Sequence, residues 1–531
     1  MPALHSDTAI LVDPGVREAG FEVDTLVAAL AGLVTKPVML VLGLARHPEL
    51  LTRAVKVSGA RRAVVVTAEL GHPPIALLRT WGAAGGLAPL GIQVVALDIL
   101  RARRSALERS TYARRMVAAA VAALDAPDTA RAARRPVGDS LSRRALLSGR
   151  ATTWVPVVEV DTSACLGTLR CQRCIQTCPE DALQIRSDVA SAAPMVDVSR
   201  CGACSRCLDT CPTGALSLDG HDPATLVKRL QALLQSDAGG RAPSLIISCQ
   251  SAADPVHRLG KRGGLPGWLV LELTCLGGIG STWHLAAMAA GAPTVQILPC
   301  ERCLDSAFLA KQLRFTRTVL TALGDGQASR RVGVLPARGT HLKRAILAAA
   351  GLIALVDRTG ADRMPAPDSI KSSAQVAAWA VGELQRASGT AVRDQDGQPV
   401  VIHGDGAPLG WLRAVDGCTA CGVCARTCPT RALSLSAALG CTELVLDPTA
   451  CTGCALCVQT CPEGVLEAVP GVDLALLMGG CEPIARSAVA DCPDCGELVP
   501  ALPAAAHLTG LPAGLVGRCP RCRQAALVAS I

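Results

Sequence analysis

Apolar runs of strand length alternate with amphipathic stretches along the first 135 residues. The strand-like runs lie at 37–43, 61–69 and 91–99, and the stretches with helical spacing lie at 47–59, 73–84 and 105–126. Apolar strands separated by helices are typical of a parallel sheet that is covered on both faces. The pattern therefore predicts an α/β layered domain over residues 1–135.

The same alternation returns after the middle of the chain. Strand-like runs at 244–249, 268–275, 294–300 and 332–337 predict a second α/β domain over residues 243–356, which we call the middle domain. An Arg-rich linker at 136–162 and a polar linker at 357–410 are expected around it. The second linker contains one predicted helix, at 373–387.

Cysteine dominates the composition of this 531-residue chain, which has 26 cysteines and only 2% aromatic residues. Most of the cysteines stand two or three residues apart, a spacing that indicates metal ligation in a reducing compartment rather than a disulfide framework. We find neither a secretory signal nor an apolar run long enough to span a membrane, so a cytoplasmic location is expected. The mild net charge of +8 does not predict nucleic-acid binding.

Residues 411–470 contain two regular cysteine motifs. Each has the spacing Cys-x2-Cys-x2-Cys-x3-Cys-Pro, and the proline is expected to open a helix. In such motifs the fourth cysteine ligates the other [4Fe–4S] cluster. The predicted ligand sets are Cys418, Cys421, Cys424 and Cys461 for one cluster, and Cys451, Cys454, Cys457 and Cys428 for the other.

Residues 163–220 repeat this arrangement with one irregularity. Five residues separate Cys165 from Cys171, so Cys165 needs a longer loop to reach iron. The predicted ligand sets are Cys165, Cys171, Cys174 and Cys211, and Cys201, Cys204, Cys207 and Cys178. Zinc knuckles use pairs of CxxC and do not match this spacing. Both segments resemble two-cluster bacterial ferredoxins over about 60 residues each. We therefore call residues 163–220 the first ferredoxin block and residues 411–470 the second ferredoxin block.

Four further cysteines, the middle sulfur site, lie in the middle domain: Cys249, Cys275, Cys300 and Cys303. Three of them end predicted strands, where ligands of parallel sheets gather, and Cys303 is expected to open a helix. The segments SLIISC, LELTCLGGIG and VQILPCERC resemble the delta subunit of methyl-viologen-reducing hydrogenases. That resemblance implies a [2Fe–2S] cluster on these four residues, although the last pair is spaced more closely than in the family. Buried, redox-inert cysteines are the alternative.

The N-terminal domain resembles the N-terminal region of the flavin-binding subunit of heterodisulfide reductase, over ARRAVVVTAELGHPPIALLRTWGAAGGLAPLGIQVVALDI. In that family the strand end corresponding to Thr67-Ala68 carries a cluster-binding cysteine. This chain has no cysteine before Cys165, so docking or scaffolding is the expected role. The flavin-binding turn of the family is also missing, because the glycines in VVIHGDGAPLG at 400–410 have the wrong spacing.

Residues 490–531 contain two CxxC pairs, formed by Cys492, Cys495, Cys519 and Cys522. Four thiolates suit tetrahedral Zn²⁺, so a zinc ribbon is predicted, with rubredoxin-type iron as the alternative. His507 lies between the pairs and is not needed as a ligand. Cys441 and Cys481 receive no role.

These observations predict a multidomain α/β plus α+β protein with two α/β layered domains, two ferredoxin-like 2[4Fe–4S] domains and a C-terminal zinc ribbon. No paired acid and base groups mark a substrate site, so a non-catalytic electron-transfer subunit is expected. Its partners would be redox protein subunits that serve as donor and acceptor in a heterodisulfide-reductase or hydrogenase type of complex. Two alternatives remain: an accessory protein for metalloenzyme assembly, indicated by SRRALLSGR at 142–150 and the ribbon, and a self-sufficient disulfide-type reductase.

Overall fold

The computed structural model describes most of the chain, which divides into two compact units, Met1–Gly389 and Thr390–Ile531. The described residues are 7–44, 46–69, 75–88, 90–103, 105–124, 132–136, 152–185, 192–218, 220–234, 242–304, 307–336, 339–352, 355, 370, 372–438, 440–500, 515 and 518–529.

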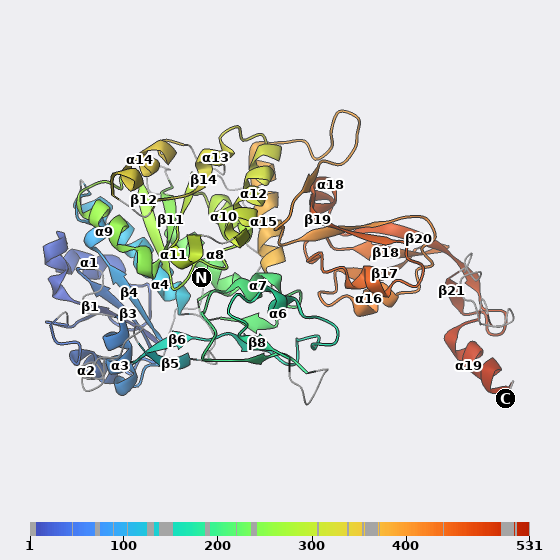
Figure 1. Ribbon diagram of the computed structural model, residues 1–531, viewed down its shortest axis with the longest axis horizontal. Coiled ribbons are helices and arrows are strands. Elements are labelled where there is room, and N and C mark those ends of the chain that lie inside the picture. Colours follow the sequence, from blue (N-terminus) through green and yellow to red (C-terminus); the bar gives the residue numbers. More distant parts are fainter. Residues whose placement is uncertain are drawn as a thin grey trace. The chain divides into compact units, whose positions relative to one another are not determined.

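The N-terminal domain is a four-stranded parallel sheet flanked by helices (Figure 1). Its strands, in the order β2-β1-β3-β4, are β1 (Thr8–Val12), β2 (Met39–Leu40), β3 (Arg62–Thr67) and β4 (Ile92–Ala96). The helices are α1 (Val23–Leu30), α2 (Leu50–Ser58), α3 (Ile75–Gly85) and α4 (Ala106–Ala123). The sequence pattern missed β1, and the strand expected over 37–43 forms only the two residues of β2.

The middle domain contains a second parallel sheet with the same strand order, β12-β11-β13-β14. Its strands are β11 (Ser244–Cys249), β12 (Trp268–Leu273), β13 (Val295–Leu298) and β14 (Val332–Val334). Its helices are α9 (Asp254–Lys261), α10 (Ser281–Ala289), α11 (Glu301–Leu304), α12 (Ala307–Ala322), α13 (Ala328–Arg331) and α14 (Gly339–Ala349). All four strands fall inside the predicted runs, because a sheet covered on both faces needs uninterrupted apolar sequence.

Two helices outside the predicted domain limits complete this unit. Helix α8 (Pro223–Leu233) packs against α4, and α15 (Ser373–Ser388) packs against α10. The sequence interpretation placed α15 in a polar linker, whereas eleven of its residues are buried, among them Val376, Ala380 and Leu384. Small residues on α15 allow close helix contact, so over these residues the segment is core rather than connector.

The first ferredoxin block is built from two short antiparallel strand pairs and two one-turn helices. Strand β7 (Glu159–Val160) pairs with β10 (Leu216–Ser217), and β8 (Leu183–Gln184) pairs with β9 (Met195–Val196). The helices are α6 (Arg173–Thr177) and α7 (Arg206–Thr210). An antiparallel hairpin, β5 (Ala132–Pro136) with β6 (Thr152–Pro156), precedes the block.

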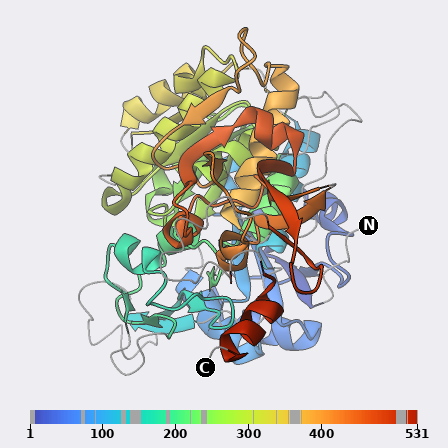
Figure 2. The ribbon, with the colours of Figure 1, turned by 90° about the vertical axis from the view of Figure 1, so that its right-hand side faces the viewer.

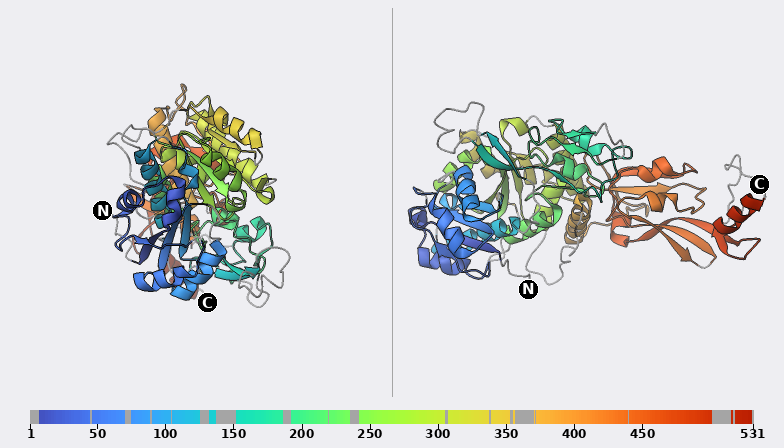
Figure 3. Two further views of the ribbon diagram at one scale, coloured as in Figure 1. Left: turned by 90° about the vertical axis from the view of Figure 1, so that its left-hand side faces the viewer. Right: turned by 90° about the horizontal axis from the view of Figure 1, so that it is seen from below.

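The second unit repeats this ferredoxin arrangement and extends it. Here β16 (Gly410–Ala414) pairs with β19 (Leu466–Asp473), and β17 (Leu433–Ala438) pairs with β18 (Cys441–Leu446), around α16 (Val423–Thr427) and α17 (Leu456–Thr460). The extensions are β15 (Val401–His403), α18 (Leu474–Gly479), β20 (Glu482–Asp491), β21 (Leu498–Pro500) and α19 (Pro520–Ala529). Figure 2 shows α19 as the red helix beside the C-terminus, and the right-hand view of Figure 3 shows the orange strands side by side.

Candidate metal centres

All four ferredoxin-type motifs end in one local structure. A one-turn helix carries the third cysteine and stops at the fourth, which has extended backbone angles. The fourth cysteines are Cys178 (φ −74°, ψ 114°), Cys211 (−75°, 114°), Cys428 (−63°, 115°) and Cys461 (−69°, 115°). The following proline explains this stop, because it excludes its predecessor from the helical region. The prediction that the proline opens a helix was wrong: it opens a turn that leads to a strand.

Residues between the cysteines adopt left-handed backbone angles in three of the four motifs. Their φ values run from 51° to 73°, at Ala203, Ser205, Ala420, Gly422, Gly453 and Ala455. This conformation turns backbone N–H groups toward the sulfurs: Cys204 accepts from Arg206, and Cys451 accepts from Gly453. Such N–H···S bonds favour the thiolate form of cysteine and tune the reduction potential of a bound cluster. Each of these three motifs has two such residues. The motif that contains Cys165 has Gly167 at φ 78° in their place.

In the first ferredoxin block the structure brings each predicted set of four cysteines to one opening. Cys165, Cys171, Cys174 and Cys211 line about 380 Å³ of space, and Cys178, Cys201, Cys204 and Cys207 line about 360 Å³. The long loop turns back at Gly167, whose carbonyl accepts the N–H of Cys171 at 3.1 Å. This turn is what places Cys165 beside the other three.

The second ferredoxin block shows the same grouping through the electrostatics of its thiols. Burial, followed by the neighbouring sulfurs of Cys418, Cys421 and Cys461, raises the pKa of Cys424 to about 11. Burial likewise raises the pKa of Cys457 to about 12, with added contributions from Cys451, Cys454 and Cys428. Each predicted set therefore shares one neighbourhood, and its fourth member comes from the other motif.

Raised pKa values have a direct consequence for metal binding. The pKa of Cys174 and that of Cys451 are about 12 as well, mainly through burial, so without a metal these thiols are protonated at neutral pH. A metal centre needs thiolates, and its formation therefore releases protons. The residues present fit iron–sulfur clusters, because they offer soft thiolate donors in groups of four with N–H groups aimed at sulfur.

Comparison with known families agrees with this geometry. The model of a 4Fe-4S dicluster domain matches residues 417–465, which cover both motifs of the second block. The model of a 4Fe-4S binding domain matches residues 194–217, which cover the second motif of the first block. The chain therefore contains two 4Fe-4S ferredoxin-type domains. No curated protein matches it.

The middle sulfur site lies at the carboxyl ends of three adjacent strands. Cys249 is the last residue of β11, Cys275 and Cys300 each follow two residues after β12 and β13, and Cys303 lies inside α11. Cys303 was expected to open the helix, but it is the third residue of α11, and Cys300 is the residue directly before that helix. The Sγ atom of Cys303 lies 3.8 Å from that of Cys249, 3.5 Å from Cys275 and 3.6 Å from Cys300.

These four sulfurs do not form a closed tetrahedron. Cys249, Cys300 and Cys303 lie within 4.8 Å of one another, and Cys275 joins the group only through Cys303. Hydrogen bonding with Cys249 is the main reason that the pKa of Cys303 is raised to about 12. Burial would raise the pKa of Cys300, but hydrogen bonds from Cys303 and its neighbours outweigh burial and lower it. Soft donors in this open arrangement suit a centre with more than one metal atom.

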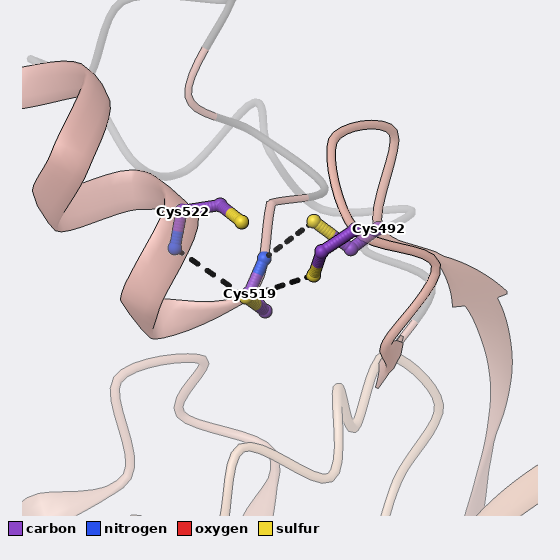
Figure 4. A group of neighbouring side chains, drawn as sticks. Cys492, Cys519 and Cys522 are labelled. Carbon is purple, nitrogen blue, oxygen red and sulfur yellow. Dashed lines mark hydrogen bonds between the residues drawn. The ribbon is translucent and has the colours of Figure 1, made fainter.

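The C-terminal sulfur site, formed by Cys492, Cys495, Cys519 and Cys522, is compact by comparison. Figure 4 labels three of these residues, Cys492, Cys519 and Cys522. All four Sγ atoms lie within 4.8 Å of one another, near the spacing of about 3.8 Å that Zn–S bonds of 2.3 Å imply for a tetrahedron. The backbone N–H of Cys519 donates to Cys492 Sγ at 3.3 Å and is the main reason that the pKa of Cys492 falls to about 6. Hydrogen bonding with Cys495 raises the pKa of Cys522.

The remaining candidates fall into two groups. Thr67 is the last residue of β3 and Ala68 follows it. VVIHGDGAPLG forms β15 and a turn into β16, and Cys441 and Cys481 lie at opposite ends of the β18–β20 pairing. His507 and the SRRALLSGR segment lie outside the described residues. Within the part of the chain that the structure describes, no helix is both long and apolar enough to cross a membrane.

Sequence reasoning missed a buried charged network between the N-terminal and middle domains. His257 on α9 bonds Asp98 through Nδ1 at 2.6 Å and Glu272 through Nε2 at 2.7 Å. Lys261, one turn further along α9, bonds Asp98 at 3.2 Å and Glu69 at 3.1 Å. The only signal in the sequence is a histidine and a lysine four residues apart on one helix face. This signal does not predict the network, because the carboxylate partners of both residues lie elsewhere in the chain.

Proposed function

We propose that this chain is an electron-transfer subunit that holds four [4Fe–4S] clusters on the four cysteine sets of its ferredoxin blocks. The observation that carries the proposal is the crossed grouping, in which the pre-proline cysteine of each motif joins the three cysteines of the other. A bound cluster takes up and releases single electrons. The protein supplies thiolates and N–H···S bonds, which hold a cluster and tune its potential.

The middle sulfur site is proposed to hold a further centre, of the [2Fe–2S] type, on Cys249, Cys275, Cys300 and Cys303. Support comes from the position of the four sulfurs at the carboxyl edge of a parallel sheet, where cofactors gather, and from their open arrangement. The C-terminal sulfur site is proposed to hold Zn²⁺, since its compact thiolate set matches a closed structural site. Its metal would stabilise a short segment that can build little core of its own.

The proposed setting is a cytoplasmic oxidoreductase of the heterodisulfide-reductase or hydrogenase type, with redox protein subunits as donor and acceptor. The resemblances of the middle and N-terminal domains support this setting. The chain itself lacks the flavin-binding turn of that family, so electron pairs would be split in a partner rather than here. Anaerobic co-purification from the native source tests the setting, because a relay subunit remains in a stoichiometric complex.

Metal analysis of anaerobically prepared protein tests the central proposal. Four [4Fe–4S] clusters and one [2Fe–2S] cluster contain about 18 iron atoms per chain, together with a matching amount of acid-labile sulfide. Fewer than about twelve iron atoms in folded protein would contradict the four-cluster proposal. Zinc is counted in the same sample, and iron in its place at the C-terminal site would give a rubredoxin-type spectrum instead.

A further inference from the structure

The loop that follows β12 touches both the middle sulfur site and the first ferredoxin block. It runs from Cys275 to Gly280 and contains the pair Gly277-Gly278. A Cβ atom placed on Gly277 would lie 3.3 Å from Cys204 Cβ, 3.5 Å from Cys275 Sγ and 3.9 Å from Cys303 Sγ. A single Cβ atom on Gly277 would thus be in van der Waals contact with predicted ligands of two separate metal centres.

Gly278 brings the two backbones together. A Cβ atom at this position would lie 2.3 Å from Arg206 N, 2.4 Å from Cys204 O and 2.6 Å from Ser205 C. All three are backbone atoms of the ferredoxin loop, which cannot rotate away as a side chain could. Only glycine permits this approach, as at other sites where two backbones meet closely.

Polar contacts hold the loop and the ferredoxin helix α7 together. Arg206 Nε donates to the carbonyl oxygen of Gly277 at 3.1 Å, and its guanidinium carbon lies 5.1 Å from the ring centre of Phe308 on α12. One helical turn further, Asp209 accepts a hydrogen bond from Ser373 Oγ at 2.7 Å, which links α7 to α15. The contact is therefore part of the packed core of the unit and not a loose surface encounter.

We propose that the Gly277-Gly278 turn is a positioning element for direct electron exchange between the middle sulfur site and the centre on Cys178, Cys201, Cys204 and Cys207. This inference rests on the proposed function. In the exchange, one centre is oxidised by one electron and the other is reduced by one, and no bond forms or breaks. Electrons would thus enter or leave the first ferredoxin block through its second cluster, because that cluster borders the middle domain.

Electron paramagnetic resonance of the full-length, anaerobically reduced protein tests the inference. When both centres are paramagnetic, contact between their ligands produces a spin–spin interaction that splits and broadens both signals. Gly278→Ala forces the two backbones apart and is expected to reduce the splitting while iron and sulfide contents stay at wild-type levels. Gly326→Ala is the matched control, since its Cβ would meet nothing within 4 Å, and it should leave the spectrum unchanged.

A second pair of variants covers the case in which Gly278→Ala does not fold. Gly277→Ala meets only side-chain atoms at 3.3 Å or more, and Arg206→Lys keeps the charge but loses the Nε bond to Gly277. Both are expected to weaken the splitting at full cluster content. An uncoupled wild-type spectrum with both centres reduced, or unchanged splitting in all three variants, would overturn the inference. A shortfall of iron in the wild-type protein would instead refute the proposed function.

Discussion

The buried histidine between the two α/β domains makes the stability of unit 1 depend on pH above neutrality. Burial alone lowers the pKa of His257, but hydrogen bonds to Asp98 and Glu272 outweigh burial and raise the pKa to about 9. Each ring nitrogen faces a carboxylate, so both must carry a proton to donate. Lys261 and Glu69 complete the charged groups around the imidazolium.

The sign and size of this dependence come from the pKa difference. An unfolded histidine titrates near pH 6.5, so the stabilisation is fully present below that pH and is lost as the pH rises through about 9. A difference of roughly 2.5 pKa units at 1.36 kcal/mol each is about 3 kcal/mol. Above this window a neutral imidazole can donate to only one of the two carboxylates.

Hydrogen–deuterium exchange of the cluster-containing protein measures this contribution locally. The amides of α9 should lose protection, corrected for intrinsic exchange rates, between pH 6.5 and pH 9. His257→Gln should lower their protection by about 3 kcal/mol at pH 6.5 and remove most of the pH dependence. His284→Gln is the control, because burial lowers the pKa of His284 to about 3 and this ring stays neutral throughout the window. Protection that is constant with pH in the wild-type protein would refute the reasoning.

Three further outcomes are expected. Cys211→Ser should remove the cluster of the opposite motif and lower the iron content by about four atoms per chain, whereas Cys441→Ser should leave iron and sulfide contents unchanged; equal contents in both would contradict the crossed grouping. Cys519→Ser should release the C-terminal metal, measured as zinc by mass spectrometry, without loss of iron. Gly471→Ala should lower the urea midpoint of the second unit, because its φ is 131° and a Cβ would lie 2.1 Å from Ile402 O, a strain of about 1–3 kcal/mol; an unchanged midpoint would show that the strand relaxes.

The cysteine spacing predicted the two ferredoxin blocks because cluster ligation and the pre-proline stop are local properties. Cys178 and Cys428 have nearly the same backbone angles in different units, since a proline follows each of them. The spacing also predicts which cysteines share a cluster, because in motifs of this type the fourth cysteine ligates the cluster of the other motif. A sequence pattern therefore suffices where a few neighbouring residues determine both the conformation and the chemistry.

Tertiary contacts set the features that the sequence could not predict. Helix α15 looked like part of a polar linker, because what buries it is its match with α10 and not its own pattern. The Gly277-Gly278 pair resembles an ordinary flexible turn until the ferredoxin loop is found against it. His257 lies 159 residues from Asp98 in the sequence, and no local pattern predicts a contact between residues so far apart.

The two α/β domains share one strand order but differ in what stands at the carboxyl edge of the sheet. In the middle domain this edge carries cysteines, which suits a metal centre. In the N-terminal domain this edge carries Asp13 directly after β1, Thr67 as the last residue of β3 and Asp98 two residues after β4, all buried. Asp98 holds His257, and its neighbour Ile99 lies so close to α9 that a Cβ on Gly260 would be 2.6 Å from Ile99 Cγ1. At the carboxyl edge of its sheet the middle domain gathers thiols. Near the same edge of its own sheet, the N-terminal domain instead has a carboxylate and close backbone contacts, and with these it docks onto the middle domain.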